Sequence, residues 1–438
     1  MTILIGGGTL LPMADGPRAM RGDLLIEGRR IAAIGAVAAP RDAQVVDASG
    51  CFVLPGLVQT HVHLVQTIFR GLAEDLSLLD WLGTRVWPLE AAHDEASLRA
   101  SVRLGILELL LTGTTTVLDM GTTHGGDVVM DEIARSGIRA RAGEAMMDTG
   151  ERVPRGLLRS TQASLDSAAS LAARWDGHDD GRLRYAYAPR FALTCTRELL
   201  EAIADRSRKG GHLVHTHSNE NADERVLVER ATGRAPAAYL VDTGIASERA
   251  VLAHGVHLEP AEVRALREAG AAIAHCPSSN LKLASGVADV VALREAGITV
   301  GIGADGAACN NRLDALEELR LAALLARSKH GPDALGAWDA LRMGTVDGAR
   351  SLRAEDEFGS LEVGKRADVI VLDGAALAPG GDEATRILYG GGSRAVRDVI
   401  VDGQLFVRDR VPTRMDPAEV RARAAEALPG LLSRAGLR

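Results

Sequence analysis

The chain has 438 residues, of which 46% are hydrophobic, 25% are charged and only 3% are aromatic. These are the values of a globular protein, and the length favours one large domain together with a smaller one. A formal net charge of −8 without a dense Lys/Arg run argues against nucleic-acid binding, and no apolar run approaches the length of a membrane span.

The cysteines of the chain show no CxxC spacing, which favours reduced thiols over a disulfide framework. The N-terminal residues lack the basic region and the long apolar core of a signal peptide. We therefore expect a cytoplasmic protein. The four cysteines are Cys51, Cys195, Cys276 and Cys309.

The N-terminal part of the chain, up to residue 54, is predicted to form short strands separated by turns that contain glycine and proline. From residue 55 to about residue 352, short apolar strands alternate with helical patterns. The strands are predicted at 57–61, 114–119, 138–145, 183–189, 212–217, 250–254, 271–275 and 299–304. The helices between them include 96–111, 160–174, 196–209, 260–269, 288–296 and 313–326.

This alternation predicts the α/β class, because repeated strand–helix units form a parallel sheet. About eight such units favour a closed (β/α)8 TIM-type barrel over residues 55–354. An open doubly wound sheet is the alternative, but no G-x-G-x-x-G follows the first strand. In a barrel, the carboxyl ends of all the strands meet at one mouth, where active sites lie.

After residue 353 the strand pattern returns at 364–373, 396–401 and 404–407, and 417–428 is predicted to be a surface helix. Because the two β-rich segments flank the barrel in sequence, we expect residues 1–54 and 355–438 to pair. Together they are predicted to form one small composite β-sandwich domain.

The first predicted barrel strand ends in two histidines, His61 and His63. Side chains alternate along a strand, so these two imidazoles face the same side and form half of a metal site. Three later strand ends offer further ligands. They carry His215-Thr216-His217, His254 and Asp305, and the spacing alone leaves open which of His215 and His217 binds a metal.

Three histidines and one aspartate leave room for a water on a divalent cation, which lowers the pKa of that water towards neutrality. Asp305 is then expected to take the proton of the water, and Glu220 to pass a proton to the substrate and the leaving group. His254 would orient the attacking oxygen. One metal is expected, because a second usually needs a bridging anion such as a carbamylated lysine, and residues 183–189 contain no lysine. Zinc suits this ligand set, and Fe²⁺ or Mn²⁺ also fit.

Several segments resemble the amidohydrolase superfamily, and within it the mononuclear aminohydrolases of purine and triazine rings. The likeness covers essentially the whole chain and implies that His217 is the ligand, with His61, His63 and Asp305. It also implies that Glu220 is the acid/base, that His254 assists, and that the protein is a homo-oligomer. The matching segments are 55–63, 215–220, His254, 275–286, 303–306 and 359–368.

A long insertion follows the first strand and leads from residue 66 to Glu90. Aromatic residues are rare in this chain, so Phe69, Trp81 and Trp87 in one loop predict a cover for a flat ring, although Trp81 has packing as an alternative role. The segment is similar to that of the deaminases of S-adenosylhomocysteine, methylthioadenosine and 5′-deoxyadenosine. The resemblance implies that Glu90 holds the hydroxyls of a ribose.

The fourth strand ends in Pro189-Arg190-Phe191. A similar Pro-Arg-Phe occurs in guanine deaminases, where the arginine reads the base, and in sequences grouped with the 5′-deoxyadenosine deaminases. Arg190, Phe191, Trp87 and Glu90 are therefore the predicted substrate contacts, and Arg190 fits an adenine as well as an oxo-purine.

These observations predict a single-metal hydrolase of carbon–nitrogen bonds other than peptide bonds. Its small-molecule substrate is expected to be an adenine nucleoside with a small or thioether 5′ substituent, from which it releases ammonia. Guanine deaminase and s-triazine hydrolase are alternatives within the enzyme class. A non-catalytic barrel is disfavoured, because it would be expected to have lost ligands that are all present here.

Overall fold

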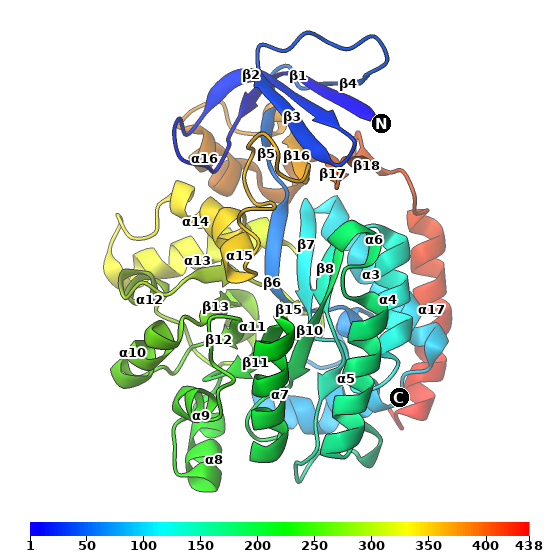
Figure 1. Ribbon diagram of the computed structural model, residues 1–438, viewed down its shortest axis with the longest axis vertical. Helices are drawn as coiled ribbons and strands as arrows, with labels where there is room; N and C mark the ends of the chain where they lie inside the picture. Colours follow the sequence, from blue (N-terminus) through cyan, green and yellow to red (C-terminus); the bar gives the residue numbers. More distant parts are fainter. Residues whose placement is uncertain (438) are drawn as a thin grey trace.

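Parallel strands close into a barrel in the computed structural model, which describes residues 1–437 (Figure 1). Hydrogen bonds between β14 and β6 complete the ring, at Ile302 and Gln59. The (β/α)8 prediction is therefore confirmed. The eight strands are β6 (Leu57–His63), β7 (Thr114–Asp119), β8 (Arg139–Ala142), β10 (Leu183–Pro189), β11 (Leu213–Ser218), β12 (Ala250–His254), β13 (Ala272–His275) and β14 (Val300–Ile302).

Two short strands extend the carboxyl ends of the barrel. β9 (Ala145–Met146) pairs with β10, and β15 (Asp305–Gly306) pairs with β6. In the second pair Asp305 lies opposite Val62, and Gly306 opposite His63. This register brings an aspartate of the last barrel strand beside the two histidines of the first.

Helices surround the barrel, and several begin at a side chain that accepts a backbone N–H, which satisfies a donor that the first helical turn leaves free. Asp94, Ser160, Thr196, Asp289 and Asp314 are such caps. The helices are α3 (Glu95–Leu111), α4 (Gly126–Ser136), α5 (Thr161–Trp175), α7 (Arg197–Gly210), α8 (Ala222–Thr232), α9 (Pro236–Asp242), α10 (Pro260–Ala269), α11 (Pro277–Lys282), α12 (Val290–Glu295), α13 (Ala315–His330), α14 (Ala337–Met343) and α15 (Val346–Ser351).

The two β-rich ends of the chain form one sheet of nine strands above the barrel (Figure 1). β5 (Phe52–Pro55) and β16 (Val369–Leu372) join its two halves, with Leu54 opposite Ile370. The domain boundaries at residues 54 and 355 stay a prediction. The other strands are β1 (Thr2–Leu10), β2 (Met20–Glu27), β3 (Arg30–Gly35), β4 (Gln44–Asp47), β17 (Val396–Val401), β18 (Gln404–Arg408) and β19 (Val411–Pro412).

The chain passes from this sheet into the barrel at Gly56. A Cβ atom there would lie 2.2 Å from the Oγ1 atom of Thr115, so only glycine fits between β5 and β6. The Pro-Gly pair that interrupts the apolar run before His61 therefore marks the junction of the sheet and the barrel.

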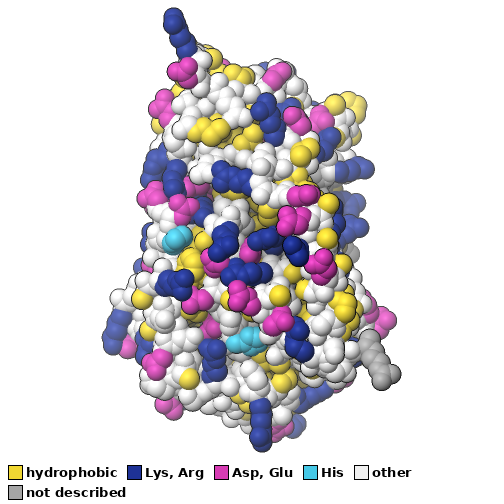
Figure 2. All heavy atoms as spheres, turned by 90° about the vertical axis from the view of Figure 1, so that its right-hand side faces the viewer, with side chains coloured by type: hydrophobic (Ala, Val, Ile, Leu, Met, Phe, Trp, Pro, Cys, Tyr) yellow, Lys and Arg dark blue, Asp and Glu magenta, His cyan; other side chains and the backbone are white. Residues whose placement is uncertain are grey.

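The last helix, α17 (Pro417–Arg434), packs on α3 of the barrel, and its Leu431 is buried. Figure 1 shows it along the side of the barrel although it follows the strands of the sheet. Figure 2 shows this face, on which basic and acidic side chains are interspersed. Among the described residues, no helix is long and apolar enough to cross a membrane.

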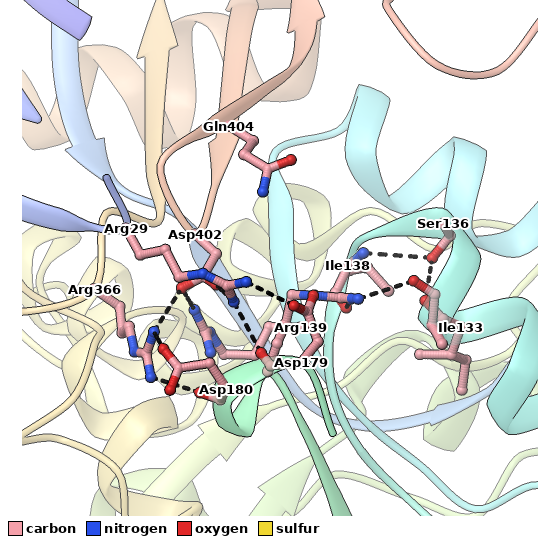
Figure 3. Close-up of polar contacts among 12 residues, drawn as sticks. Arg29, Ile133, Ser136, Ile138, Arg139, Asp179, Asp180, Arg366, Asp402 and Gln404 are labelled. Carbon is pink, nitrogen blue, oxygen red and sulfur yellow. Dashed lines mark hydrogen bonds and ion pairs between the residues drawn. The ribbon is translucent and has the colours of Figure 1, made fainter. Parts of the chain in front are cut away.

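A buried ion network joins the sheet to the barrel (Figure 3). Arg139 of β8 contacts Asp368 at 2.6 Å and Asp402 at 2.8 Å, and all three side chains are almost fully buried. Arg29 lies 2.7 Å from the other carboxylate oxygen of Asp402 and also contacts Asp179. Asp402 therefore connects charges from both parts of the chain.

Replacing Asp402 with asparagine is expected to lower the free energy of unfolding by about 3 kcal/mol, because it leaves a buried arginine without its full counter-charge. Asp409→Asn is the matched control. Both aspartates have a φ of 50°, which asparagine tolerates, but Asp409 is exposed and is expected to lose under about 1 kcal/mol. Urea unfolding of both variants measures the difference, and equal losses would contradict the role of Asp402.

Candidate active site

Three histidines and one aspartate meet at the carboxyl end of the barrel. One ligand atom from each of His61, His63, His217 and Asp305 lies within 4.8 Å of all the others. The Nε2 atoms of His63 and His217 are 3.2 Å apart, and Nε2 of His61 lies 3.1 Å from Oδ1 of Asp305. These are the four residues that the family resemblance assigns to a metal.

The state of these ligands fits a divalent cation. Burial, and then the neighbouring His61, lower the pKa of His63 and of His217 well below the usual range. Both imidazoles are therefore neutral and offer lone pairs, which metal binding requires. Three nitrogens and one carboxylate oxygen form a common ligand set for zinc and related metals.

Hydrogen bonds behind the ligands fix their orientation. Nδ1 of His217 donates to the carbonyl oxygen of Arg190 at 2.6 Å, which leaves Nε2 for a metal. Nδ1 of His61 lies 2.6 Å from Nε2 of His215. His215 therefore lies behind His61, and of the two histidines that spacing leaves open, only His217 has a ligand atom within the cluster. Oδ2 of Asp305 accepts from Ser279 at 2.6 Å.

His254 and Glu220 lie beside this cluster. Nδ1 of His254 donates to the side-chain oxygen of Asn280 at 2.8 Å, so its Nε2 is free of a proton and faces Glu220 at 3.5 Å. Burial lowers the pKa of His254 to about 4. Burial, and then the charge of Asp305, raise the pKa of Glu220 well above its usual range. The pair therefore combines a neutral imidazole with a carboxyl group whose burial favours the protonated form.

The backbone is strained where these side chains leave their strands. His254 has a φ of 78° and Asp305 a φ of 60°, values that residues other than glycine rarely adopt. Such strain persists only where the surrounding structure holds it, and it is frequent at active sites. It turns both side chains towards the same point.

A narrow cavity of about 20 Å³ is lined by three of the four ligands, namely His63, His217 and Asp305, and also by Glu220 and His254. This is room for about one water molecule, so a ring-sized substrate cannot enter until the cover moves. Leu78, Trp81 and Leu82 form that cover. They belong to a continuous helical segment made of α1 (Leu78–Trp81), a π-helical turn η2 (Leu82–Val86) and α2 (Trp87–Ala91). Besides the metal ligands, Glu220 and His254, the polar residues of the wall are Gln66 and Arg190.

A second, larger cavity of about 400 Å³ lies next to the first, and Phe191 lines both. Trp87 lines this second cavity, together with Arg152 and Arg230. Phe69 lines neither and instead stacks on His93, with ring centroids 5.2 Å apart. The three aromatic residues of the insertion therefore have three different positions.

Glu90 differs from its expected place. Its side chain is fully buried, and both carboxylate oxygens accept from Arg190, at 2.6 and 3.1 Å. Oε1 also accepts from Gln66 at 2.9 Å. Glu90 lines neither cavity. In this structure Glu90 therefore stands behind Arg190, which itself lines the narrow cavity.

Two supporting residues are not identified by sequence reasoning as part of the site, namely Gln66 and Asn280. Gln66 follows His63 by three residues, and a Cβ on Gly306 would lie 2.1 Å from its Oε1 atom. Asn280 sits in α11, immediately after β13. Their positions in the chain, next to the first and seventh strand ends, are the only sequence signal for them.

His93 supports the segment that follows His63. Its ring nitrogens lie 2.9 Å from the carbonyl oxygen of Val65 and from the hydroxyl of Ser97, and burial lowers its pKa to about 4. A histidine whose pKa is lower in the folded than in the unfolded state stabilises the fold at pH values above its unfolded pKa of about 6.5. This contribution is lost as the pH falls towards 4.

When the pH falls from 7.5 to 5.5, the free energy of unfolding of His93→Gln is therefore expected to decrease by about 1 kcal/mol less than that of the wild type. Urea unfolding at the two pH values measures this slope. The exposed His178 provides the control, since His178→Gln should keep the wild-type slope. An unchanged slope in His93→Gln would contradict the assignment.

Comparisons with known proteins agree with this geometry. The model of the family described as the amidohydrolase family matches residues 52–406. A 5-methylthioadenosine/S-adenosylhomocysteine deaminase of Halobacterium salinarum is 38% identical over 444 residues, which cover 99% of each chain. A 5′-deoxyadenosine deaminase of Methanothermobacter thermautotrophicus is 36% identical over 416 residues, or 93% of each chain.

A solved structure has the same fold. The crystal structure of an adenosine deaminase from Xanthomonas campestris with bound zinc matches 98% of each chain, with 31% identity and a TM-score of 0.92. The family match and the full-length similarities agree with the motifs around His61, His217 and Asp305. The chain belongs to the amidohydrolase family.

Proposed function

We propose that this protein is a metal-dependent hydrolytic deaminase of adenine nucleosides with a small or thioether 5′ substituent. It replaces the amine of the adenine ring with oxygen from water and releases ammonia. The observation that carries the proposal is the cluster of four metal-ligand side chains beside Glu220 and the neutral His254, next to a cavity that all of these residues except His61 line. The names of the full-length relatives support the substrate class.

The proposed metal is a single zinc ion held by His61, His63, His217 and Asp305. The zinc in the Xanthomonas campestris structure supports this choice, and Fe²⁺ or Mn²⁺ remain alternatives. When bound, such an ion lowers the pKa of water and supplies a nucleophile at neutral pH.

The residues of the chain move the protons. Glu220 donates its proton to the ring nitrogen next to the amine-bearing carbon, as water adds to that carbon. Asp305 accepts the proton released by the water, and Nε2 of His254 accepts a hydrogen bond from the added oxygen. The proton held by Asp305 then passes to the amine, which leaves as ammonia, while the hydroxyl proton of the added oxygen passes to Glu220, so that the carbon keeps a carbonyl oxygen and both carboxyl groups return to their starting states.

The two adjoining cavities suit the two ends of such a nucleoside. The flat base would lie at the narrow cavity, against Phe191, once Trp81 has moved aside. The 5′ substituent would then extend into the larger cavity. Its wall combines Leu79 and Trp87 with Arg152 and Arg230, which suits a thioether chain that ends in a charged group.

Guanine deamination is a second candidate, because Arg190 and Gln66 line the narrow cavity and offer hydrogen bonds to an oxo-purine. A homo-oligomeric state and a cytoplasmic location also stay predictions. The four cysteines are buried free thiols, which is consistent with that location.

Ammonia release from a small panel tests the proposal. The panel comprises 5′-deoxyadenosine, methylthioadenosine, S-adenosylhomocysteine, adenosine, guanine and an aminated triazine. We expect the zinc-loaded protein to prefer the adenine nucleosides. A preference for guanine or the triazine would replace the proposed substrate, and no release from any nucleoside would refute it.

A further inference from the structure

The loop that carries Glu220, between β11 and α8, is held by a buried carboxylate. Oε2 of Glu224 accepts the backbone N–H of Glu220 at 2.7 Å and that of Asn221 at 3.4 Å. Glu224 is 1% exposed and lines neither cavity. It therefore contacts the backbone of the proposed acid without facing the space for a substrate.

The contact with Glu220 goes beyond an ordinary helix cap. Glu224 is the third residue of α8, and its bond to the N–H of Asn221, the residue before the helix, completes a capping box. That box needs only the longer of the two contacts. The shorter one reaches one residue further back, so the carboxylate holds the backbone of Glu220 more closely than that of the cap residue.

The residue before Glu220 is fixed from another side. Asn219 has a φ of 53°, and its Nδ2 donates to Oε1 of Glu262 at 3.0 Å. Its carbonyl oxygen accepts the backbone N–H of Val256 at 2.9 Å. With the backbone held at Asn219 and at Glu220, the carboxyl group of Glu220 lines the narrow cavity, 3.5 Å from Nε2 of His254.

We propose that Glu224 is a positioning residue, which holds the backbone of Glu220 so that its carboxyl group meets the ring of the substrate. The inference rests on the proposed function, because it takes Glu220 as the proton carrier. Without Glu224, the N–H of Glu220 would lose its acceptor, and an unpaired buried donor is costly, so the loop would shift. A shift of about 1 Å at a reacting group can lower the rate by roughly 100-fold.

Glu224→Met tests this role, because methionine has a similar length but accepts no N–H. It is expected to lower kcat by roughly 100-fold, with KM and zinc content within about threefold of the wild type. Glu224→Gln keeps an oxygen that can accept the N–H of Glu220, so it is expected to retain at least about a third of the wild-type kcat. Equal losses in the two variants, or no loss in Glu224→Met, would overturn the proposal. Glu224→Ala replaces Glu224→Met in all these measurements if the larger side chain prevents folding.

Asp314→Ala is the matched control. Asp314 also accepts two backbone N–H groups at the start of a helix, those of Leu316 and Glu317 at 3.0 and 3.3 Å, but it lines neither cavity. Its variant is expected to keep kcat within about threefold of the wild type. A loss as large as that of Glu224→Met would overturn the proposal, because any broken helix start would then lower the activity.

Combination with Glu220→Gln separates positioning from a general effect on the fold. Since Glu224 is proposed to act through Glu220, Glu224→Met should lower kcat by less than about threefold in a protein that already carries Glu220→Gln. A further loss of about 100-fold would overturn the positioning role, because the two effects would then be independent.

The failure of the proposed function would look different. If Glu220→Gln alone kept the wild-type kcat, the proposed proton carrier would fall, and the positioning role with it. If Glu220→Gln lost its activity but Glu224→Met did not, only the positioning role would fall. If the wild type preferred guanine, the same variants measured on guanine would test the inference in the same way, since the acid would serve either ring.

Discussion

Glu220→Gln is expected to lower kcat by about 10³-fold or more while the fold and the metal content stay unchanged. Glutamine has the shape of the protonated acid but cannot give up a proton to the ring, and general acid–base groups contribute about 10² to 10⁴ in rate. The side chain is buried, and this burial raises its pKa and favours the protonated form. The amide therefore replaces a neutral acid, with little change in charge.

Steady-state deamination and the metal content of the purified variant check this result. Asp223→Asn serves as the control, because Asp223 is an exposed carboxylate at the start of α8, the helix that follows Glu220. It is expected to retain wild-type activity. If Glu220→Gln kept more than a tenth of the wild-type kcat, Glu220 would not be the proton carrier.

His217→Ala is expected to abolish both bound metal and turnover, whereas His215→Ala is expected to weaken metal binding by about 10- to 100-fold. The two histidines are two residues apart on β11, but only His217 has a nitrogen within the ligand cluster. His215 instead contacts Nδ1 of His61 from behind. A supporting residue tunes a ligand and does not replace it.

Metal content after dialysis against a range of free zinc concentrations separates the two variants. His217→Ala should remain nearly free of metal at concentrations that saturate His215→Ala. The reverse order would mean that the ligand set is wrong, and that His215 holds the metal in the working protein.

Much of the site could be predicted from sequence because it lies at strand ends. His61, His63, His217, His254 and Asp305 each follow a short apolar run, and in a closed barrel all such ends meet. The alternation of strand and helix therefore predicts their proximity without any knowledge of distances.

The position of Glu90 could not be predicted in this way. It lies in the helical cover, 100 residues before Arg190, and their pairing depends on how that cover packs against the end of β10. A motif identifies a carboxylate near the mouth but not the direction in which it points. Here the carboxylate points to an arginine that also stands at the mouth.

The packing of α17 could not be predicted from the sequence either. Its sequence predicts a helix with one apolar side, but nothing in it names the surface that this side covers. The chain leaves the nine-stranded sheet and returns to α3, where Arg434 contacts Asp94 at 3.0 Å. Long-range docking of this kind depends on the finished shape of the barrel.

The most direct test of the account is the fate of oxygen from water during turnover. The zinc-loaded protein is incubated with 5′-deoxyadenosine in water enriched in oxygen-18, and the product is analysed by mass spectrometry with ammonia measured in parallel. The account predicts one labelled oxygen in the base of each product molecule and one ammonia released for each. Release of the intact base, or a product with its amine retained, would contradict it.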